Sequence, residues 1–128
     1  MFIVPWQGAY VGAINEPAIG KEDLLVVGSG SGETAIPVSI TQIAKKTGAR
    51  VIHIGSNKNS TISALADMVV RIPCRTKLVL PDEINSSQPM SSLFEQSLFL
   101  FLDIISLMII EKKKINLNDL WYTHANLE

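Results

Sequence analysis

The stretch LLVVGSGSGET, residues 24–34, decides the fold that this sequence predicts. Its first four residues, Leu24 to Val27, are all apolar, as in a strand that is covered on both faces. Glycines and small hydroxyl residues follow up to Thr34, and the next residues have the apolar spacing of a helix. A strand, a small-residue loop and a helix start in this order are typical of a turn that binds phosphate.

The loop offers an anion donors of three kinds. Glycines let the backbone approach a ligand closely and adopt positive φ. The first amides of the following helix lack intrahelical acceptors, and the helix dipole favours negative charge beside them. Hydroxyl side chains add further donors. The candidate phosphate-binding or substrate-binding residues are Ser29, Gly30, Ser31, Gly32, Glu33 and Thr34.

The spacing within the loop excludes two common phosphate-binding motifs. No lysine follows the glycines, as the GxxxxGK[ST] loop of nucleotide hydrolases requires. The GxGxxG motif would have its third glycine at residue 33 or 35, counted from Gly28 or Gly30, and the sequence has Glu33 and Ala35 there. Hydroxyls in place of lysine indicate a small phosphoester held by neutral donors. The alternative is that the Gly/Ser run is only a flexible linker or a tight turn.

The rest of the chain alternates strand-like and helix-like segments. Apolar runs bounded by turn residues predict strands at 23–27, 50–54 and 68–72, and residues 1–13 read as extended. Helices are expected at about 34–47, 60–66 and 91–113, with a short one capped by Asn116 or Asn118. The alternation predicts an α/β domain with a parallel sheet and right-handed crossovers. Ligands bind such sheets beyond the carboxyl ends of the strands.

Length and composition narrow the function further. The chain of 128 residues is long enough for one domain. A net charge of −1 gives no electrostatic reason to expect nucleic acid or an anionic membrane as partner. Cys74 is the single cysteine, which excludes an internal disulfide and fits a reducing cytoplasm. No signal peptide is predicted, because polar and proline residues at 5–7 interrupt the apolar start.

The predicted helix at 91–113 indicates assembly. Its residues are apolar on nearly every side, and such a helix is expected to be buried all round in a soluble protein. Asp103 and Ser106 interrupt its apolar run, which argues against a membrane span. A small domain can cover one face, so the rest is expected to meet a second subunit in a homodimer or homotetramer. The alternative is the central core helix of a monomer.

Several motifs together resemble the SIS (sugar isomerase) domain family. Residues 28–34 are similar to the family's phosphate loop, and Ser56-Asn57 with Ser60 and residues 65–67 are similar to its next strand–loop–helix unit. Within the family the chain most resembles the 6-phospho-3-hexuloisomerases. The residues that carry this closer resemblance are PAIG at 17–20, RIP at 71–73, SLFE at 92–95 and HANLE at 124–128.

The resemblance implies a fold and a reaction. The fold would be a flavodoxin-like, three-layer sandwich with a mainly parallel sheet, here lacking the family's first βα unit, with residues 1–128 as one domain. The reaction would interconvert D-arabino-3-hexulose 6-phosphate and fructose 6-phosphate through a cis-enediol. Moving a carbonyl between neighbouring carbons needs a base and polar groups, but no metal or organic cofactor.

By the same resemblance, Glu95 and His124 are the candidate catalytic residues. Glu95 would carry the proton between carbons, and its place beside Phe94 predicts partial desolvation. His124 would shuttle a proton or donate to a substrate oxygen. The alternatives are that Glu95 only complements the helix dipole and that His124 is a surface residue. A non-catalytic sugar-phosphate sensor and an inactive fragment are the competing functions.

Overall fold

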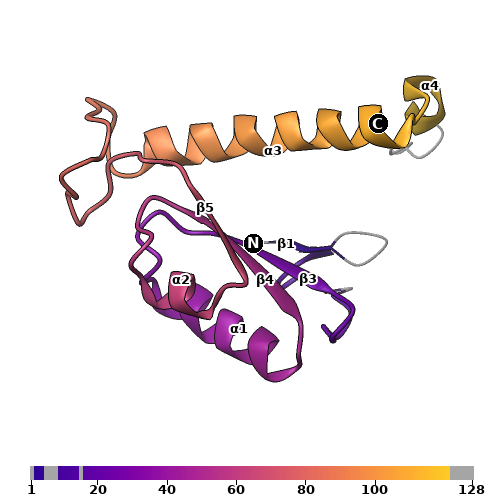
Figure 1. The fold of residues 1–128 in the computed structure, drawn as a ribbon, viewed down its shortest axis with the longest axis horizontal. Coiled ribbons are helices and arrows are strands. Elements are labelled where there is room, and N and C mark those ends of the chain that lie inside the picture. The colour runs from indigo at the N-terminus through magenta and orange to yellow at the C-terminus, as the bar shows by residue number, and fades with distance from the viewer. Residues whose placement is uncertain (1, 5–8, 15, 122–128) are drawn as a thin grey trace.

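The computed structural model describes residues 2–4, 9–14 and 16–121. Five strands and four helices are formed in this part of the chain (Figure 1). Their bounds are β1 Phe2–Val4, β2 Ala9–Tyr10, β3 Leu24–Gly28, α1 Ala35–Lys46, β4 Arg50–Gly55, α2 Thr61–Leu65, β5 Met68–Arg71, α3 Ser92–Lys113 and α4 Leu117–Leu120.

The strands form one sheet in the order β2-β1-β3-β4-β5. Strands β3, β4 and β5 are parallel, with Leu24 opposite Arg50 and Ile52 opposite Met68. Strand β1 pairs antiparallel with β3, and β2 pairs antiparallel with β1. The mainly parallel α/β sheet is therefore confirmed, and its antiparallel edge is formed by the segment that the sequence marks only as extended.

Three layers are stacked in this part of the chain. Helices α1 and α2 lie on one face of the sheet, and α3 runs across the other (Figure 1). Helix α1 begins after Thr34, places Pro37 in its first turn, and ends before Gly48, which has φ of +86°. The local signals in the sequence therefore predict the helix ends to within a residue or two.

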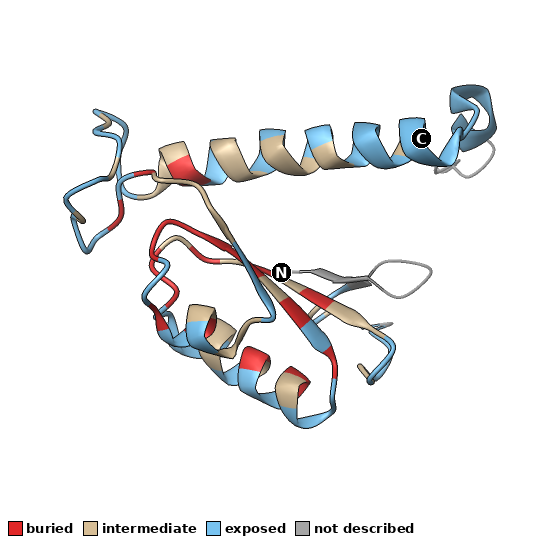
Figure 2. Ribbon diagram, in the orientation of Figure 1, coloured by how far each residue is buried: buried red, intermediate tan, exposed pale blue. Residues whose placement is uncertain are grey.

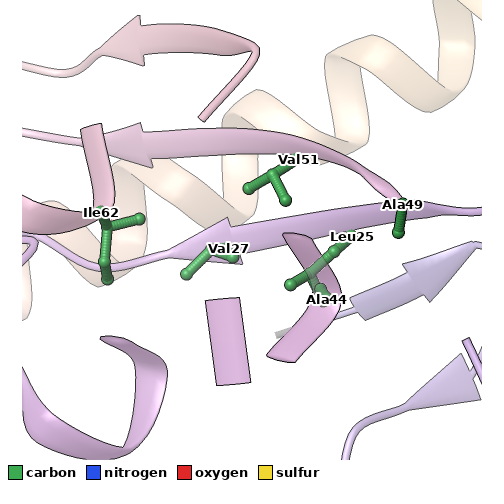
Figure 3. Close-up of a cluster of buried hydrophobic side chains, with 6 residues drawn as sticks. All are labelled: Leu25, Val27, Ala44, Ala49, Val51 and Ile62. Atoms are coloured by element: carbon green, nitrogen blue, oxygen red, sulfur yellow. The ribbon is translucent and has the colours of Figure 1, made fainter. Parts of the chain in front are cut away.

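The hydrophobic core lies between the sheet and the α1–α2 layer. Alternate residues of β3, Leu25 and Val27, are fully buried on this face, while their neighbours are only partly buried on the other. The expectation from the apolar run that β3 is covered on both faces is therefore met in full on only one face of the sheet. Figure 3 shows the core cluster, which consists of Leu25, Val27, Ala44, Ala49, Val51 and Ile62.

Helix α3 is not buried all round in the single chain. Phe94 in its first turn is its one buried residue, and a partly buried stripe continues along the side that faces the sheet (Figure 2). The other sides expose large apolar side chains. These are Phe99, Leu100, Ile104, Leu107, Met108 and Ile109.

By length and composition, α3 could also cross a membrane. It has 22 residues and a mean hydropathy of 2.0, and 6% of its most apolar window is buried. A single helix of this kind is a weak indication, because core helices of soluble proteins pass the same test.

The core predicts a large cost for truncating Leu25. Because this side chain is fully buried, Leu25→Ala should lower the free energy of unfolding by about 2–5 kcal/mol. Urea denaturation followed by circular dichroism measures the change. The control Leu117→Ala, at a residue that is 58% exposed, should cost less than about 0.5 kcal/mol. Equal losses in the two variants would contradict this placement of the core.

Candidate functional site

A cleft of about 910 Å³ opens at the loop between the end of β3 and the start of α1. We call residues 28–34 the glycine loop; Ser29, Gly30, Ser31 and Thr34 of this loop line one side of the cleft. The rest of the lining comes from residues 75–91, which connect β5 to α3, and from the first turns of α3. The cleft therefore lies beyond the carboxyl ends of the parallel strands, where the sheet topology predicts a ligand.

The glycine loop is held from behind by the β4–α2 unit. Four successive carbonyls of the loop, those of residues 29–32, all accept hydrogen bonds from residues 53–62. The pairs are Ser29 O with His53 Nε2 (2.9 Å), Gly30 O with the amides of Ser56 (2.9 Å) and Asn57 (3.1 Å), Ser31 O with Asn57 Nδ2 (3.3 Å), and Gly32 O with the Ile62 amide (3.2 Å). These contacts fix the direction in which each peptide of the loop points.

Because the loop's carbonyls point toward the β4–α2 unit, the amides of the same peptides point away from it. In a trans peptide, the N–H of one residue points opposite to the C=O of the residue before it. The amides of Gly32 and Glu33 find acceptors within the loop, at the hydroxyls of Ser29 and Ser31. The amides of Gly30 and Ser31 donate to no acceptor among the described residues. They are therefore available to an anion in the cleft.

The start of α1 adds further free donors. Its first amides have no intrahelical acceptor, and its first turn carries no acidic residue. Thr34, the N-cap residue, makes no side-chain capping bond, so its hydroxyl is also free to donate. The helix dipole adds partial positive charge at the same point. This arrangement suits a phosphate group.

His53 supports the glycine loop, a role that the sequence alone does not predict. It lies on β4 and is fully buried, and Nε2 donates to the Ser29 carbonyl. Because a carbonyl only accepts, that nitrogen carries the proton, and Nδ1 is left to face the Ser63 hydroxyl at 2.9 Å. His53 thereby connects the glycine loop to α2.

Two glycines allow this arrangement. A Cβ at Gly55 would lie 2.5 Å from both the His53 ring and the Ser29 carbonyl. A Cβ at Gly32, where φ is +66°, would lie 2.1 Å from the Ser60 hydroxyl. Both positions thus require glycine for the loop to pack against β4 and α2. Gly32 supports the loop from this side and does not line the cleft.

Glu33 is engaged outside the cleft. Its carboxylate accepts bonds from the amide and the hydroxyl of Thr61, each at 2.8 Å, at the start of α2. These bonds, and to a lesser extent the charge of Lys77, hold the pKa of Glu33 below its usual value. Glu33 therefore joins two loops of the site, and it is not among the residues that line the cleft.

The connection after β5 brings cations that the local motif does not contain. Arg75 and Lys77 line the cleft together with the glycine loop, and Thr76 lies between them in the sequence. The sequence around the loop suggested neutral donors alone, and the structure adds two positive charges from about 45 residues further along. No periodic pattern marks residues 75–89, so only the folded arrangement reveals this contribution.

Glu95 lies in the cleft lining, in the first turn of α3. Its carboxylate accepts a hydrogen bond from the Ser91 hydroxyl at 2.8 Å. The residue is exposed, so the partial desolvation expected beside Phe94 is not provided by the described part of the chain. The structure thus brings Glu95 into one cleft with Ser29, Gly30, Ser31 and Thr34.

His124 lies outside the described residues, so its predicted role stays a prediction. Cys74 is buried, and its Sγ lies 3.6 Å from the Ser97 hydroxyl. Among residues 2–4, 9–14 and 16–121, no group of three or more His, Cys, Asp or Glu side chains could hold a metal ion.

The buried histidine predicts a pH-dependent stability. Burial lowers the pKa of His53 below its usual 6.5, which outweighs the opposing effect of the bond to Ser29. Below that value the unfolded chain binds a proton that the folded chain does not. The stability is therefore full above about pH 6.5 and declines as the pH falls toward the folded pKa.

His53→Gln should remove this dependence, because the amide does not titrate. Urea denaturation between about pH 7.5 and about pH 5 measures it in both proteins. His124→Gln is the matched control, since the chain has only two histidines, and it should keep the dependence of the parent. A parent-like slope in His53→Gln would contradict the neutral, buried state of His53.

Comparisons with known proteins agree with this fold. The sequence profile described as "SIS domain" matches residues 13–100. The chain is 38% identical over 118 residues to a 3-hexulose-6-phosphate isomerase of Bacillus subtilis, covering 92% of this chain and 64% of that protein. It is 40% identical over 117 residues to a protein of the same name from Mycobacterium gastri, covering 91% and 58%.

A solved structure supports the fold. A Methanococcus jannaschii protein, whose crystal structure was described as inferring a molecular function of 3-hexulose-6-phosphate isomerase, superposes with a TM-score of 0.81. It is 24% identical, and the match covers 94% of this chain and 63% of that one. The chain thus spans about six tenths of the length of these relatives. On the profile match over most of its length, the chain belongs to the SIS domain family.

Proposed function

We propose that this chain is a sugar-phosphate isomerase domain that interconverts D-arabino-3-hexulose 6-phosphate and fructose 6-phosphate. One observation carries the proposal: a single cleft holds both an anion-binding loop and a carboxylate on a separate helix. The names of the relatives from Bacillus subtilis and Mycobacterium gastri support the choice of substrate. Residues 1–128 would form one sugar-phosphate-binding domain, acting in the cytoplasm.

The glycine loop would bind the phosphate of the substrate. The amides of Gly30 and Ser31, the first amides of α1 and the Thr34 hydroxyl are free donors on one side of the cleft. Ser29 and Ser31 line the same side. Anchoring the substrate by its phosphate would place the rest of the sugar along the cleft toward α3.

Glu95 would be the base. In the forward direction, its carboxylate removes the proton from C2 of the 3-ketose, and electrons move into a C2–C3 double bond to give a cis-enediol. The same group then returns the proton to C3, and the carbonyl forms at C2. One carboxylate can serve both steps because the two carbons are adjacent. His124, by family resemblance, would hand a proton to or from a substrate oxygen.

A second candidate function is sugar-phosphate binding without catalysis. The exposure of Glu95 favours it, because a solvated carboxylate bonded to Ser91 lacks the dry surroundings that promote proton abstraction from carbon. The part of the relatives' length that the chain does not span is a second reason to test it. The binding and turnover measurements below separate the two functions.

We also propose that the chain forms a homodimer or homotetramer through helix 91–113. In the single chain, α3 exposes six large apolar side chains between Phe99 and Ile109, and a second subunit would remove them from water (Figure 2). Nucleic acid and membrane partners are not part of the proposal.

The base assignment predicts that Glu95→Gln stops turnover but not binding. Replacing a general base by an amide of similar shape should lower kcat by about 10²- to 10⁴-fold. A coupled assay measures conversion of the hexulose phosphate, and calorimetry measures fructose 6-phosphate binding. Glu111→Gln, near the other end of α3, is the matched control and should keep full activity. Unchanged kcat in Glu95→Gln would remove this residue from the mechanism.

The phosphate assignment predicts a loss of affinity in Thr34→Val. This change removes a hydroxyl that makes no capping bond, so stability should not change. Affinity for fructose 6-phosphate should fall by about 1–3 kcal/mol, the range for a hydrogen bond to a charged group. Ser106→Ala, which removes an exposed hydroxyl on α3, should leave affinity unchanged. If both variants bind like the parent, Thr34 does not contact the phosphate.

A further inference from the structure

Two cations that line the cleft have no ion-pair partner among the residues that the structure describes. Arg75 and Lys77 both face the cleft from the segment that follows β5. The ion pairs of the described residues are Lys45 with Asp67 and Arg71 with Asp82, and neither involves them. Two like charges that flank one residue repel each other unless an anion lies between them or close by. The arrangement therefore favours binding of a negatively charged group.

Two carboxylates beside this segment, Glu33 and Glu83, are held by other donors, and Glu95 in the same cleft lining is bonded to Ser91. Glu33 accepts both of its bonds from Thr61. Glu83 accepts one bond from the Thr76 hydroxyl at 2.6 Å and one from the Leu80 amide at 2.9 Å. Both acids thus serve to order the loops around the cleft. They leave the ammonium and the guanidinium free to meet a ligand.

Thr76 fixes this segment against the glycine loop. It is buried, with 7% of its surface exposed, while its two neighbours are exposed. Its methyl group would lie 3.4 Å from a Cβ placed on Gly30, so it packs directly on the loop. Its hydroxyl donates to Glu83 and accepts from the Leu78 amide at 3.2 Å. One side chain thus sets the position of the residues on either side of it.

The turn after Thr76 is closed and strained. The Thr76 carbonyl accepts from the Val79 amide at 3.2 Å. Val79 has φ of +50°, a conformation that β-branched residues rarely adopt, and it lines the cleft. Backbone strain of this kind persists where surrounding contacts hold it, as the Glu83 bonds do here.

We propose that Arg75 and Lys77 supply the positive charge that binds the substrate's phosphate dianion, and that Thr76 is the positioning residue that holds both cations over the glycine loop. The inference rests on the proposed function and adds to it a charged half of the phosphate site. The glycine loop provides directed but neutral donors, and the cations provide the net charge that those donors lack. Because the cations attract only a negatively charged ligand, the site should select a phosphate dianion over a neutral sugar.

The first experiment removes each charge. Calorimetry would measure the Kd of fructose 6-phosphate for the parent, Arg75→Gln and Lys77→Gln. Each variant should bind about threefold to tenfold more weakly, between the effect of an exposed ion pair and that of a hydrogen bond to a buried charge. Lys46→Gln, in the last turn of α1, removes the same charge away from the cleft and should bind like the parent.

Salt separates charge from shape. Raising the salt concentration from about 0.05 M to about 0.5 M should weaken fructose 6-phosphate binding more in the parent than in Lys77→Gln. Added ions screen the attraction between the Lys77 ammonium and the phosphate, and the variant lacks that attraction. Inorganic phosphate should show the same ranking of variants as the sugar phosphate. Equal affinities and equal salt dependence in parent, Arg75→Gln and Lys77→Gln would overturn the proposal.

The second experiment tests Thr76 through the cations. Thr76→Val keeps the shape and removes the hydroxyl, so it should weaken fructose 6-phosphate binding in the parent, whereas Thr76→Ser should restore it. In a chain that already carries Arg75→Gln and Lys77→Gln, Thr76→Val should cause no further loss. A full additional loss in that background would show that Thr76 does not act through the cations and would overturn its positioning role.

The outcomes also separate this inference from the proposed function. A parent that binds fructose 6-phosphate and loses affinity with each cation variant, but does not isomerise it, supports the inference and contradicts the isomerase. A parent that isomerises while the cation variants keep their affinity does the reverse. A parent that binds neither fructose 6-phosphate nor inorganic phosphate overturns both.

Discussion

The site depends on one constraint: the carbonyls of the glycine loop are bonded to the neighbouring β4–α2 unit. Each of these bonds, from His53 Nε2 to the Ile62 amide, uses an acceptor that would otherwise face the cleft. With the carbonyls satisfied inside the protein, the loop presents amides to the cleft instead. The parallel register of β3 and β4, which sets Val27 opposite His53, makes this possible because it brings the donors to the same edge of the sheet.

The positive charges of the cleft and its oriented hydrogen-bond donors come from different parts of the chain. The loop and the start of α1 hold oriented donors without a cation, whereas Arg75 and Lys77 sit on a segment whose shape is set by Thr76 and Glu83. Arg71 attaches the same connection to β5, through a two-bond contact with Asp82 and a bond to the Ser56 carbonyl. The outer side of the cleft is thus tied to the same sheet edge as the inner side.

The sequence predicts the parts of this structure that depend on near neighbours. The loop, the helix start at Thr34 and the stop at Gly48 each have a local cause, and the structure places them as expected. His53 could not be recognised, because its role depends on which strand lies beside β4. The cations could not be recognised either, because residues 75–89 have no period and their position is set by contacts with distant residues.

Helix α3 packs against the glycine loop in its first turns and exposes an apolar surface in its later turns. In its first turns, Leu98 would lie 2.6 Å from a Cβ on Gly28 and Phe94 lies 3.5 Å from the Cβ position of Gly30, so the helix packs closely on the glycine loop. Further along, the helix exposes large apolar side chains. Any surface that covers those later turns would also restrain the first ones, and with them the orientation of Glu95. The proposed association along the helix would therefore be coupled to the geometry of the cleft through one rigid element.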